Sequence, residues 1–441
     1  MLRISSFLLI VFTVSFAASA QTSSPTPAPV YKAYGEAMAA GKAAFEKNTP
    51  SVAEAAYDQA FGLASTDDQR YDALTKRGAA FEKVVRSVRA GTGKYGGTTK
   101  TVVLFPDAVA AYRKAAELAG ITVEKKAEAM MLIGDIYSST YKNEYLPKPQ
   151  SGGKGWKETA RDEFTKIINL PGISGNMKAR ALNARANAYT TTPIFGSFDN
   201  SQVQAAGKDL DAAVKTEKAS DKVKADALKD LAELGKRISD VNTYFGAYDM
   251  ITKLPAADPE QKIDAYDTLA ILYIDNAKLA EARKAANDGL AVAKAVPADR
   301  AKLYRDLAVT HLIDPANKSA DGQNALKLAN AELDKAIKPR ELKPADRAKI
   351  LISFGEYFQM LNAPWRTETA VAQYQKVLAL KGLTNKELAM AQYGIGEAYR
   401  IAGKKAEAIA AYEKVSSENG QYHNYAQQRI KEVNTPAKAP N

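Results

Sequence analysis

The sequence predicts an all-α protein of 441 residues, assembled from about nine helix-turn-helix repeats. Ala, the residue with the highest helix propensity, recurs in runs such as "AEAIAAYEK". A small residue is repeatedly followed three positions later by a ring, which puts both on one helix face. Further along, a small-large-small triplet at i, i+4 and i+7 marks a second helix, and a turn separates the two patterns.

The last repeat shows the pattern most clearly, in "AMAQYGIGEAYRIAGKKAEAIAAYEKV". Gly396 and Tyr399 share the face of a first helix. Ala408, Tyr412 and Val415 share the face of a second helix, and a glycine lies between them. Because a small residue lets two helices approach while the ring fills the space beside it, this spacing predicts an antiparallel helix pair.

The same spacing recurs from the N-terminus onward. First-helix pairs are Gly78/Phe81, Gly134/Tyr137, Ala186/Tyr189, Ala270/Tyr273, Ala308/His311 and Gly355/Phe358. Second-helix triplets are Ala53/Tyr57/Ala60, Ala108/Tyr112/Ala115, Ala160/Phe164/Ile167, Ala206/Leu210/Ala213, Ala329/Leu333/Ala336 and Ala370/Tyr374/Val377. Two fainter repeats lie around Gly41 and Ala232.

These residues resemble the tetratricopeptide repeat (TPR) family, whose helix-turn-helix repeat of about 34 residues has small and aromatic residues at such positions. The repeats extend over residues 31–433, with first-helix small residues at 41, 78, 134, 186, 232, 270, 308, 355 and 396. The resemblance implies a right-handed superhelix, an α-solenoid whose first helices line a groove. It also implies a non-catalytic scaffold or adaptor that binds a protein or peptide partner.

The hexapeptide "PADRAK" occurs twice, beginning at Pro297 and at Pro344, each 11 residues before the small residue of a first helix. Pro259 has the same place in another repeat. Proline suits the first position of a helix, because its missing N–H would have no partner there. We expect Asp299 and Asp346 to cap these helices, and the Arg and Lys of the hexapeptides to be solvated.

Residues 1–20 are typical of an export signal, with Arg3 ahead of the apolar stretch "FLLIVFTVSF" and a small-x-small cleavage pattern before Gln21. The alternative is an uncleaved anchor, but the apolar stretch is shorter than the roughly 20 residues that span a bilayer. We expect a flexible leader over residues 21–30, a disordered tail over 434–441 and no transmembrane segment after cleavage. The absence of cysteine excludes disulfides and thiolate sites and favours a bacterial periplasmic or secreted protein.

The formal net charge of +11 favours acidic partners in general. Alternatively, the Lys residues only occupy the solvent-exposed faces of helices, which would give the same net charge. Positive and negative residues alternate along the chain instead of forming basic blocks. Export argues against nucleic acid as the partner.

Long insertions interrupt the turns between first and second helices. In the fifth, sixth and ninth repeats, the small residue of the first helix and the start of the second helix are 12 positions apart. The second, third, fourth and seventh repeats exceed this spacing by 18, 14, 8 and 9 residues. Long loops in a compact array are often functional. The candidate loop contacts are Lys94, Tyr95, Tyr145, Trp156, Phe195 and Phe198. These aromatic and basic loops suggest binding of an anionic envelope polymer or glycan; alternatively, they only cover the edge of the array.

Trp156 and Trp365 precede similar second helices, in "WKETA" and "WRTETA", and either pack at the helix start or stack on a ligand. No catalytic signature is present. "AGTGKYGG" has Val88 where a Walker A motif needs its first glycine. The two histidines have no ligand-spaced partner. We therefore expect no enzyme activity, no metal and no cofactor.

The fourth first helix, "ARALNARANAY", has Arg180, Asn183 and Asn187 on one face. Asn side chains can bracket a peptide backbone and Arg can bind a carboxylate. This resembles the carboxylate clamp of peptide-binding TPR proteins, but Asp226 and Asp230 follow in the next repeat, so the clamp is not reproduced. The three residues are the candidate groove contacts.

Overall fold

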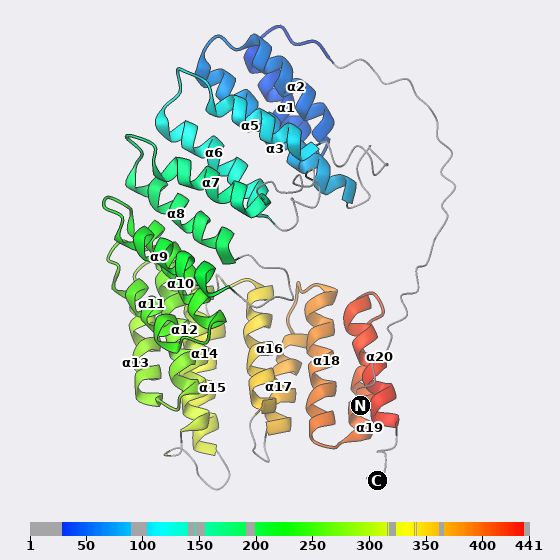
Figure 1. Cartoon of the computed structure of the whole chain (residues 1–441). Coiled ribbons are helices and arrows are strands. Elements are labelled where there is room, and N and C mark those ends of the chain that lie inside the picture. The colour runs from blue at the N-terminus through cyan, green and yellow to red at the C-terminus, as the bar shows by residue number, and fades with distance from the viewer. Residues whose placement is uncertain are drawn as a thin grey trace, which may run out of the picture. The chain divides into compact units, whose positions relative to one another are not determined.

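The computed structural model describes residues 29–89, 104–139, 146, 155–190, 199–314, 316, 323–338, 340, 342–360 and 366–435. All regular structure in these residues is helical, and the 19 helices form nine consecutive pairs followed by a last helix, α20 (Gly420–Asn434) (Figure 1). The fold class predicted from the sequence, an all-α solenoid of about nine helix pairs, is confirmed.

The first helix of each pair carries the small residue that the sequence pattern identifies. These helices are α1 (Tyr34–Glu46), α3 (Asp67–Arg89), α6 (Val123–Ser138), α8 (Gly175–Thr190), α10 (Asp221–Arg237), α12 (Pro259–Asp275), α14 (Pro297–Ile313), α16 (Pro344–Met360) and α18 (Asn385–Ile401). The second helices are α2 (Pro50–Leu63), α5 (Leu104–Ala116), α7 (Trp156–Ile168), α9 (Asn200–Lys215), α11 (Val241–Lys253), α13 (Leu279–Leu290), α15 (Gln323–Ile337), α17 (Arg366–Leu378) and α19 (Lys405–Tyr412).

The chain divides into two compact parts, residues 1–129 with 145–147, and residues 130–144 with 148–441. The first contains α1, α2, α3 and α5. The second contains the helices from α7 onward, and the division falls within α6. Within the parts, first and second helices of a pair pack together, as α1 does with α2 and α16 with α17, and a second helix also packs on the next first helix, as α2 does on α3 and α17 on α18.

A glycine beneath a ring builds the core of five repeats. The pairs are Gly41/Tyr57, Gly78/Tyr112, Gly134/Phe164, Gly355/Tyr374 and Gly396/Tyr412, and a Cβ on any of these glycines would lie 2.3–2.6 Å from a ring carbon. Where the first helix has Ala instead, the buried partner in the fourth and seventh repeats is Leu210 or Leu333. The residues therefore match in size across these seven pairs, as close packing requires.

The turn between the two helices has one conformation in the repeats without an insertion. The residue seven positions after the small residue has a positive φ: Asn48 (57°), Ser239 (57°), Ala277 (56°) and Gly403 (74°). The next backbone N–H closes the turn, for example from Lys278 to the Tyr273 carbonyl at 2.8 Å. This is the left-handed residue that commonly ends a helix.

Helices α12, α14 and α16 begin at Pro259, Pro297 and Pro344, as the hexapeptide spacing predicts. The capping expected of Asp299 is wrong. It lies in the first turn of α14, where its negative charge suits the positive end of the helix dipole, but its carboxylate pairs with Lys302 at 3.4 Å and the helix start at Val296 has no side-chain cap. The prediction that Lys302 is solvated is also wrong, because its ammonium group donates a hydrogen bond to the Asp264 carboxylate of α12 at 2.7 Å. The first hexapeptide therefore links two neighbouring repeats, whereas Lys349 of the second is 69% exposed and pairs with Asp346 of its own helix at 3.5 Å.

The predicted long turns lie between first and second helices, at residues 90–103, 139–155, 191–199 and 314–322. Almost all of these residues fall outside the described part of the chain.

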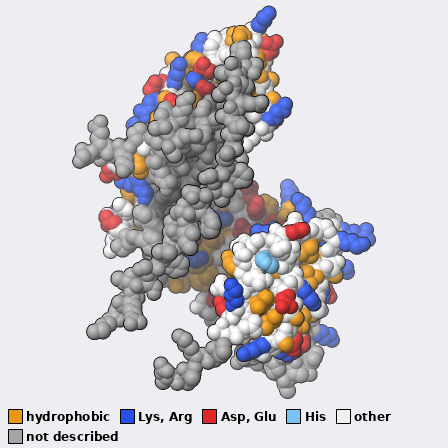
Figure 2. Space-filling model, turned by 90° about the vertical axis from the view of Figure 1, so that its right-hand side faces the viewer, with side chains coloured by type: hydrophobic (Ala, Val, Ile, Leu, Met, Phe, Trp, Pro, Cys, Tyr) orange, Lys and Arg blue, Asp and Glu red, His pale blue; other side chains and the backbone are white. Residues whose placement is uncertain are grey.

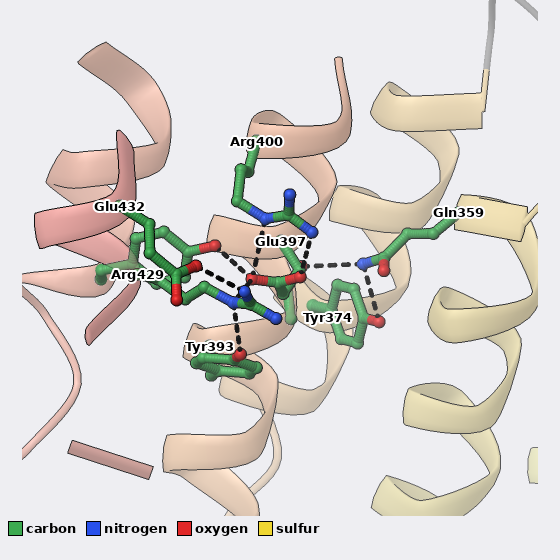
Figure 3. A network of polar contacts seen from close by, with 9 residues as sticks. Gln359, Tyr374, Tyr393, Glu397, Arg400, Arg429 and Glu432 are labelled. Carbon is green, nitrogen blue, oxygen red and sulfur yellow. Dashed lines mark hydrogen bonds and ion pairs between the residues drawn. The ribbon is translucent and has the colours of Figure 1, made fainter. Parts of the chain in front are cut away.

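Helix α20 is held on α18 by a polar network (Figure 3). The Glu397 carboxylate accepts hydrogen bonds from Arg400 at 2.8 Å and from the Tyr412 hydroxyl, and pairs with Arg429 of α20 at 3.1 Å. Arg429 also pairs with Glu432 at 2.6 Å. Because the Glu397 side chain is only 15% exposed, its charge depends on these partners.

Candidate functional site

The candidate groove contacts lie on one face of α8 and differ in how far they are engaged. Arg180 is exposed, and no hydrogen bond or ion pair joins it to another described residue. Asn183 is half-buried, and its Oδ1 atom is buried without a hydrogen-bond donor among the described residues. Asn187 is exposed and donates from Nδ2 to Asp230 of α10 at 2.9 Å. Two of the three side chains thus retain free hydrogen-bonding capacity.

A polar pocket of about 250 Å³ opens beside Asn187, between α8, α9 and α10. Arg237 spans it, pairing with Glu233 at 3.1 Å and donating to the Thr190 carbonyl at 3.4 Å. The pocket is lined by Asn187, Thr190, Leu210, Asp230, Glu233, Leu234 and Arg237. It offers both donors and acceptors, which is what a peptide backbone needs from its binding site.

Two acidic residues of α10 are engaged by neighbouring first helices. Asp226 accepts from Gln261 of α12 at 2.6 Å, and Asp230 accepts from Asn187. An Asp cannot donate to a carboxylate as the Asn of the family's clamp would. The face next to α8 is therefore acidic where a clamp would be basic.

Ion pairs continue this row from α12 to α14. Arg305 pairs with Asp267 at 2.7 Å and with Asp306 at 2.9 Å, and Lys302 pairs with Asp264. Asp306 is 1% exposed. Burial raises the pKa of the Asp306 carboxyl well above its ordinary value, and the neighbouring Asp267 carboxylate raises it further, although Arg305 opposes the shift. This cluster is a structural link between two repeats.

Sequence reasoning missed Thr190, Glu233 and Arg237, which line the pocket. A signal for the last two exists: they follow the small residue Ala232 by one and five positions, on the side of α10 that carries Asp230. Charged residues, however, are not part of the pattern of small and large residues that defines the repeats.

Five of the six candidate loop contacts, Lys94, Tyr95, Tyr145, Phe195 and Phe198, lie outside the described residues. Trp365 also lies outside them. Trp156 is the first residue of α7 and is half-buried, which agrees with packing at the start of the second helix.

The charges of the described residues are mixed. On the face that Figure 2 shows, Lys and Arg side chains (blue) are interspersed with Asp and Glu (red) and form no continuous patch of one sign. The described residues contain no cluster of three or more His, Asp or Glu side chains that could bind a metal ion. No helix among them is long and apolar enough to cross a membrane.

No protein-family model matches the chain, and no curated protein matches it in sequence. Among solved structures, it is similar to the TPR domain of P58(IPK), to the human IFIT1 dimer with PPP-AAAA and to yeast Tom70. The sequence identities are 14%, 13% and 14%, and the TM-scores are 0.21, 0.31 and 0.25. The matches cover 91%, 87% and 90% of this chain and 99%, 90% and 96% of the others. With scores this low, these likenesses carry no argument about function, and the fold rests on the helix pairs themselves.

Proposed function

We propose that the protein is a non-catalytic scaffold or adaptor that binds a protein or peptide partner along its first helices, at the α8–α10 face. The observation that carries this proposal is the free hydrogen-bonding capacity of Arg180 and Asn183, which lie on the same helix as Asn187, a residue of the polar pocket. A buried amide oxygen without a donor is costly unless a ligand supplies one. The Oδ1 atom of Asn183 is buried, so a peptide N–H reaches it only after the side chain turns outward, whereas the exposed Arg180 can donate directly to a peptide carboxylate.

The repeated fold suits this role because its first helices form an extended surface instead of one closed cavity. The ion pairs between α12 and α14 connect neighbouring first helices. A surface that is already ordered loses less conformational entropy when a partner binds.

We further propose that the protein acts in the envelope of a bacterium or outside the cell. Support comes from residues 1–20, with their apolar stretch and cleavage pattern. The intact mass of the protein recovered from envelope extract tests cleavage of the signal. It should match a chain that begins at Gln21, and a mass that includes residues 1–20 would contradict cleavage.

Affinity capture from envelope extract tests the binding site. The chain from Gln21 onward serves as bait, beside the triple variant Arg180→Ala, Asn183→Ala and Asn187→Ala. The matched control removes one exposed amide and one cation from the second helix α9, with Gln204→Ala and Lys208→Ala. We expect the wild type and the control to retain the same protein, and the triple variant to lose about nine-tenths of it, as a change of about 1.4 kcal/mol would give.

Equal retention by all three baits would contradict the proposed site. Salt-sensitive capture of an anionic polymer in place of a protein would instead favour the glycan interpretation of the long loops.

A further inference from the structure

The first compact part contains a second pocket, of about 550 Å³, formed by α1, α2 and α3. It is lined by Met38, Ala39, Lys42, Phe45, Glu46, Tyr57, Lys76 and Ala79. Its volume lies within the range of roughly 300–1,000 Å³ that is usual for ligand pockets. No sequence pattern pointed to it, because its lining comes from three helices.

The floor of this pocket is apolar and preformed. Tyr57 is 3% exposed, and its ring is fixed against Gly41, where a Cβ would lie 2.5 Å away. Met38, Phe45 and Ala79 are half-buried and so keep apolar surface in contact with solvent. Covering this surface with an apolar side chain would be favourable by about 25 cal/mol for each Å² removed from water.

The rim of the pocket is cationic. Lys42 and Lys76 are exposed, and Lys76 makes no hydrogen bond or ion pair with another described residue. Lys42 approaches Glu46 at 4.0 Å, but their side chains are 77% and 65% exposed, so this pair contributes little. Lys83 lies 4.0 Å above the Phe45 ring and donates to the Phe45 carbonyl. Among the lining residues, two cations thus accompany one carboxylate.

We propose that this pocket binds a partner peptide in which a large apolar side chain is flanked by Asp or Glu. The apolar side chain enters between Met38 and Phe45, and the flanking carboxylates meet Lys42 and Lys76. Charge complementarity selects an acidic segment over a basic one. The chain's own residues 21–30, "QTSSPTPAPV", contain no carboxylate and no aromatic ring, so they lack this chemistry.

The site is distinct from the α8–α10 face, and either can fail without the other. Three labelled peptides of equal length test it, each with a central Phe flanked by Glu, by Ser or by Lys in a Gly-Ser background. Their binding to the chain from Gln21 onward is measured by fluorescence polarisation. We expect the Glu peptide to bind at least about tenfold more tightly than the Lys peptide, with the Ser peptide between them.

Two variants address the two parts of the site. Ala39→Trp fills the pocket from an exposed position, and Lys42→Glu with Lys76→Glu reverses the rim. Each should weaken binding of the Glu peptide by about tenfold or more. The control Lys208→Glu on α9 should change the affinity for that peptide by less than about twofold. The double variant Lys42→Glu with Lys76→Glu should also bind the Lys peptide more tightly than the Glu peptide, a reversal that a folding defect would not produce.

Three results would overturn the proposal. The first is that no peptide binds, and the second is that all three bind alike. The third is that Ala39→Trp converts a dimer of the chain into a monomer in size-exclusion chromatography, because the occupant would then be a second copy.

Discussion

Asn187 on α8 donates a 2.9 Å hydrogen bond from Nδ2 to Oδ2 of Asp230 on α10. The amide that was predicted to bracket a peptide is therefore partly engaged by the next repeat. A partner that binds the Asn187 amide has to compete with this engagement. The uncommitted groups of the site are Arg180 and Asn183, and they should contribute more to binding than Asn187 does.

The size match between first and second helices predicts a coupled pair of substitutions. Gly134→Ala alone places a Cβ 2.3 Å from the Phe164 ring, so it should cost about 1–3 kcal/mol of stability through overpacking. The double variant Gly134→Ala with Phe164→Leu has the same two residue types as Ala186 and Leu210 in the fourth repeat. Its loss of stability should be clearly less than the sum of the losses in the two single variants. Urea unfolding of all four proteins measures this.

Gly246→Ala in the interior of α11 is the control for the glycine substitution, because nothing lies within 4 Å of its Cβ position. It should stabilise the protein by about 0.5–1 kcal/mol. Strictly additive costs for Gly134→Ala and Phe164→Leu would contradict the size match.

The left-handed turn residue predicts that Ala277→Gly stabilises the protein. Ala277 has a φ of 56°, which costs an L-residue roughly 1–2 kcal/mol, whereas Gly403 at the same place in the ninth repeat avoids that cost. We expect a net gain of about 0.5–1 kcal/mol, since glycine also has more freedom in the unfolded chain. Ala291→Gly, at a residue with a φ of −79°, should not stabilise. Thermal unfolding compares the two, and equal effects would show that the turn is unstrained.

The repeats were predictable because their signal is local. Gly396, Tyr399 and Tyr412 lie within 17 residues of one another, and their spacing alone defines a helix pair. The functional faces were not predictable in the same way. The Asn187–Asp230 bond joins residues 43 positions apart, and the pocket of Met38 and Lys76 needs helices from two repeats. Such contacts depend on how one repeat packs on the next, which no spacing within a repeat encodes.

The buried carboxyl of Asp306 predicts a stability that falls as pH rises. Burial raises the pKa of Asp306 above its ordinary value near 4, so the folded state holds a proton that the unfolded state has lost. Stability is then lost as pH rises from about 4 through the folded pKa. Asp306→Asn keeps an acceptor for Arg305 and cannot ionise. Its stability relative to the wild type should increase from pH 4 to pH 8 in urea titrations. A constant difference across that range would contradict this account.

Glu397 predicts the opposite pH dependence for α20. Burial opposes the ionisation of Glu397, but hydrogen bonds from Arg400 and Tyr412 outweigh it and lower the pKa of its carboxyl. The contribution of the Glu397 carboxylate is therefore present above the unfolded pKa near 4.3 and is lost as pH falls through the folded value. Glu397→Gln should cost about 1–3 kcal/mol at pH 7.

Hydrogen exchange locates this effect. The amides of residues 420–434 should exchange faster in Glu397→Gln, and their exchange rates should stay unchanged in the exposed control Glu413→Gln. Uniformly faster exchange over all helices would show that the network supports the whole second part and not α20 in particular.

Photo-crosslinking in living cells tests most directly whether the first-helix face binds a protein. A photoreactive amino acid replaces Asn187 on α8 in one strain and Gln204 on the second helix α9 in another. The account predicts a defined protein adduct from position 187 and little or none from position 204. No protein adduct from position 187, or equal adducts from both positions, would contradict it.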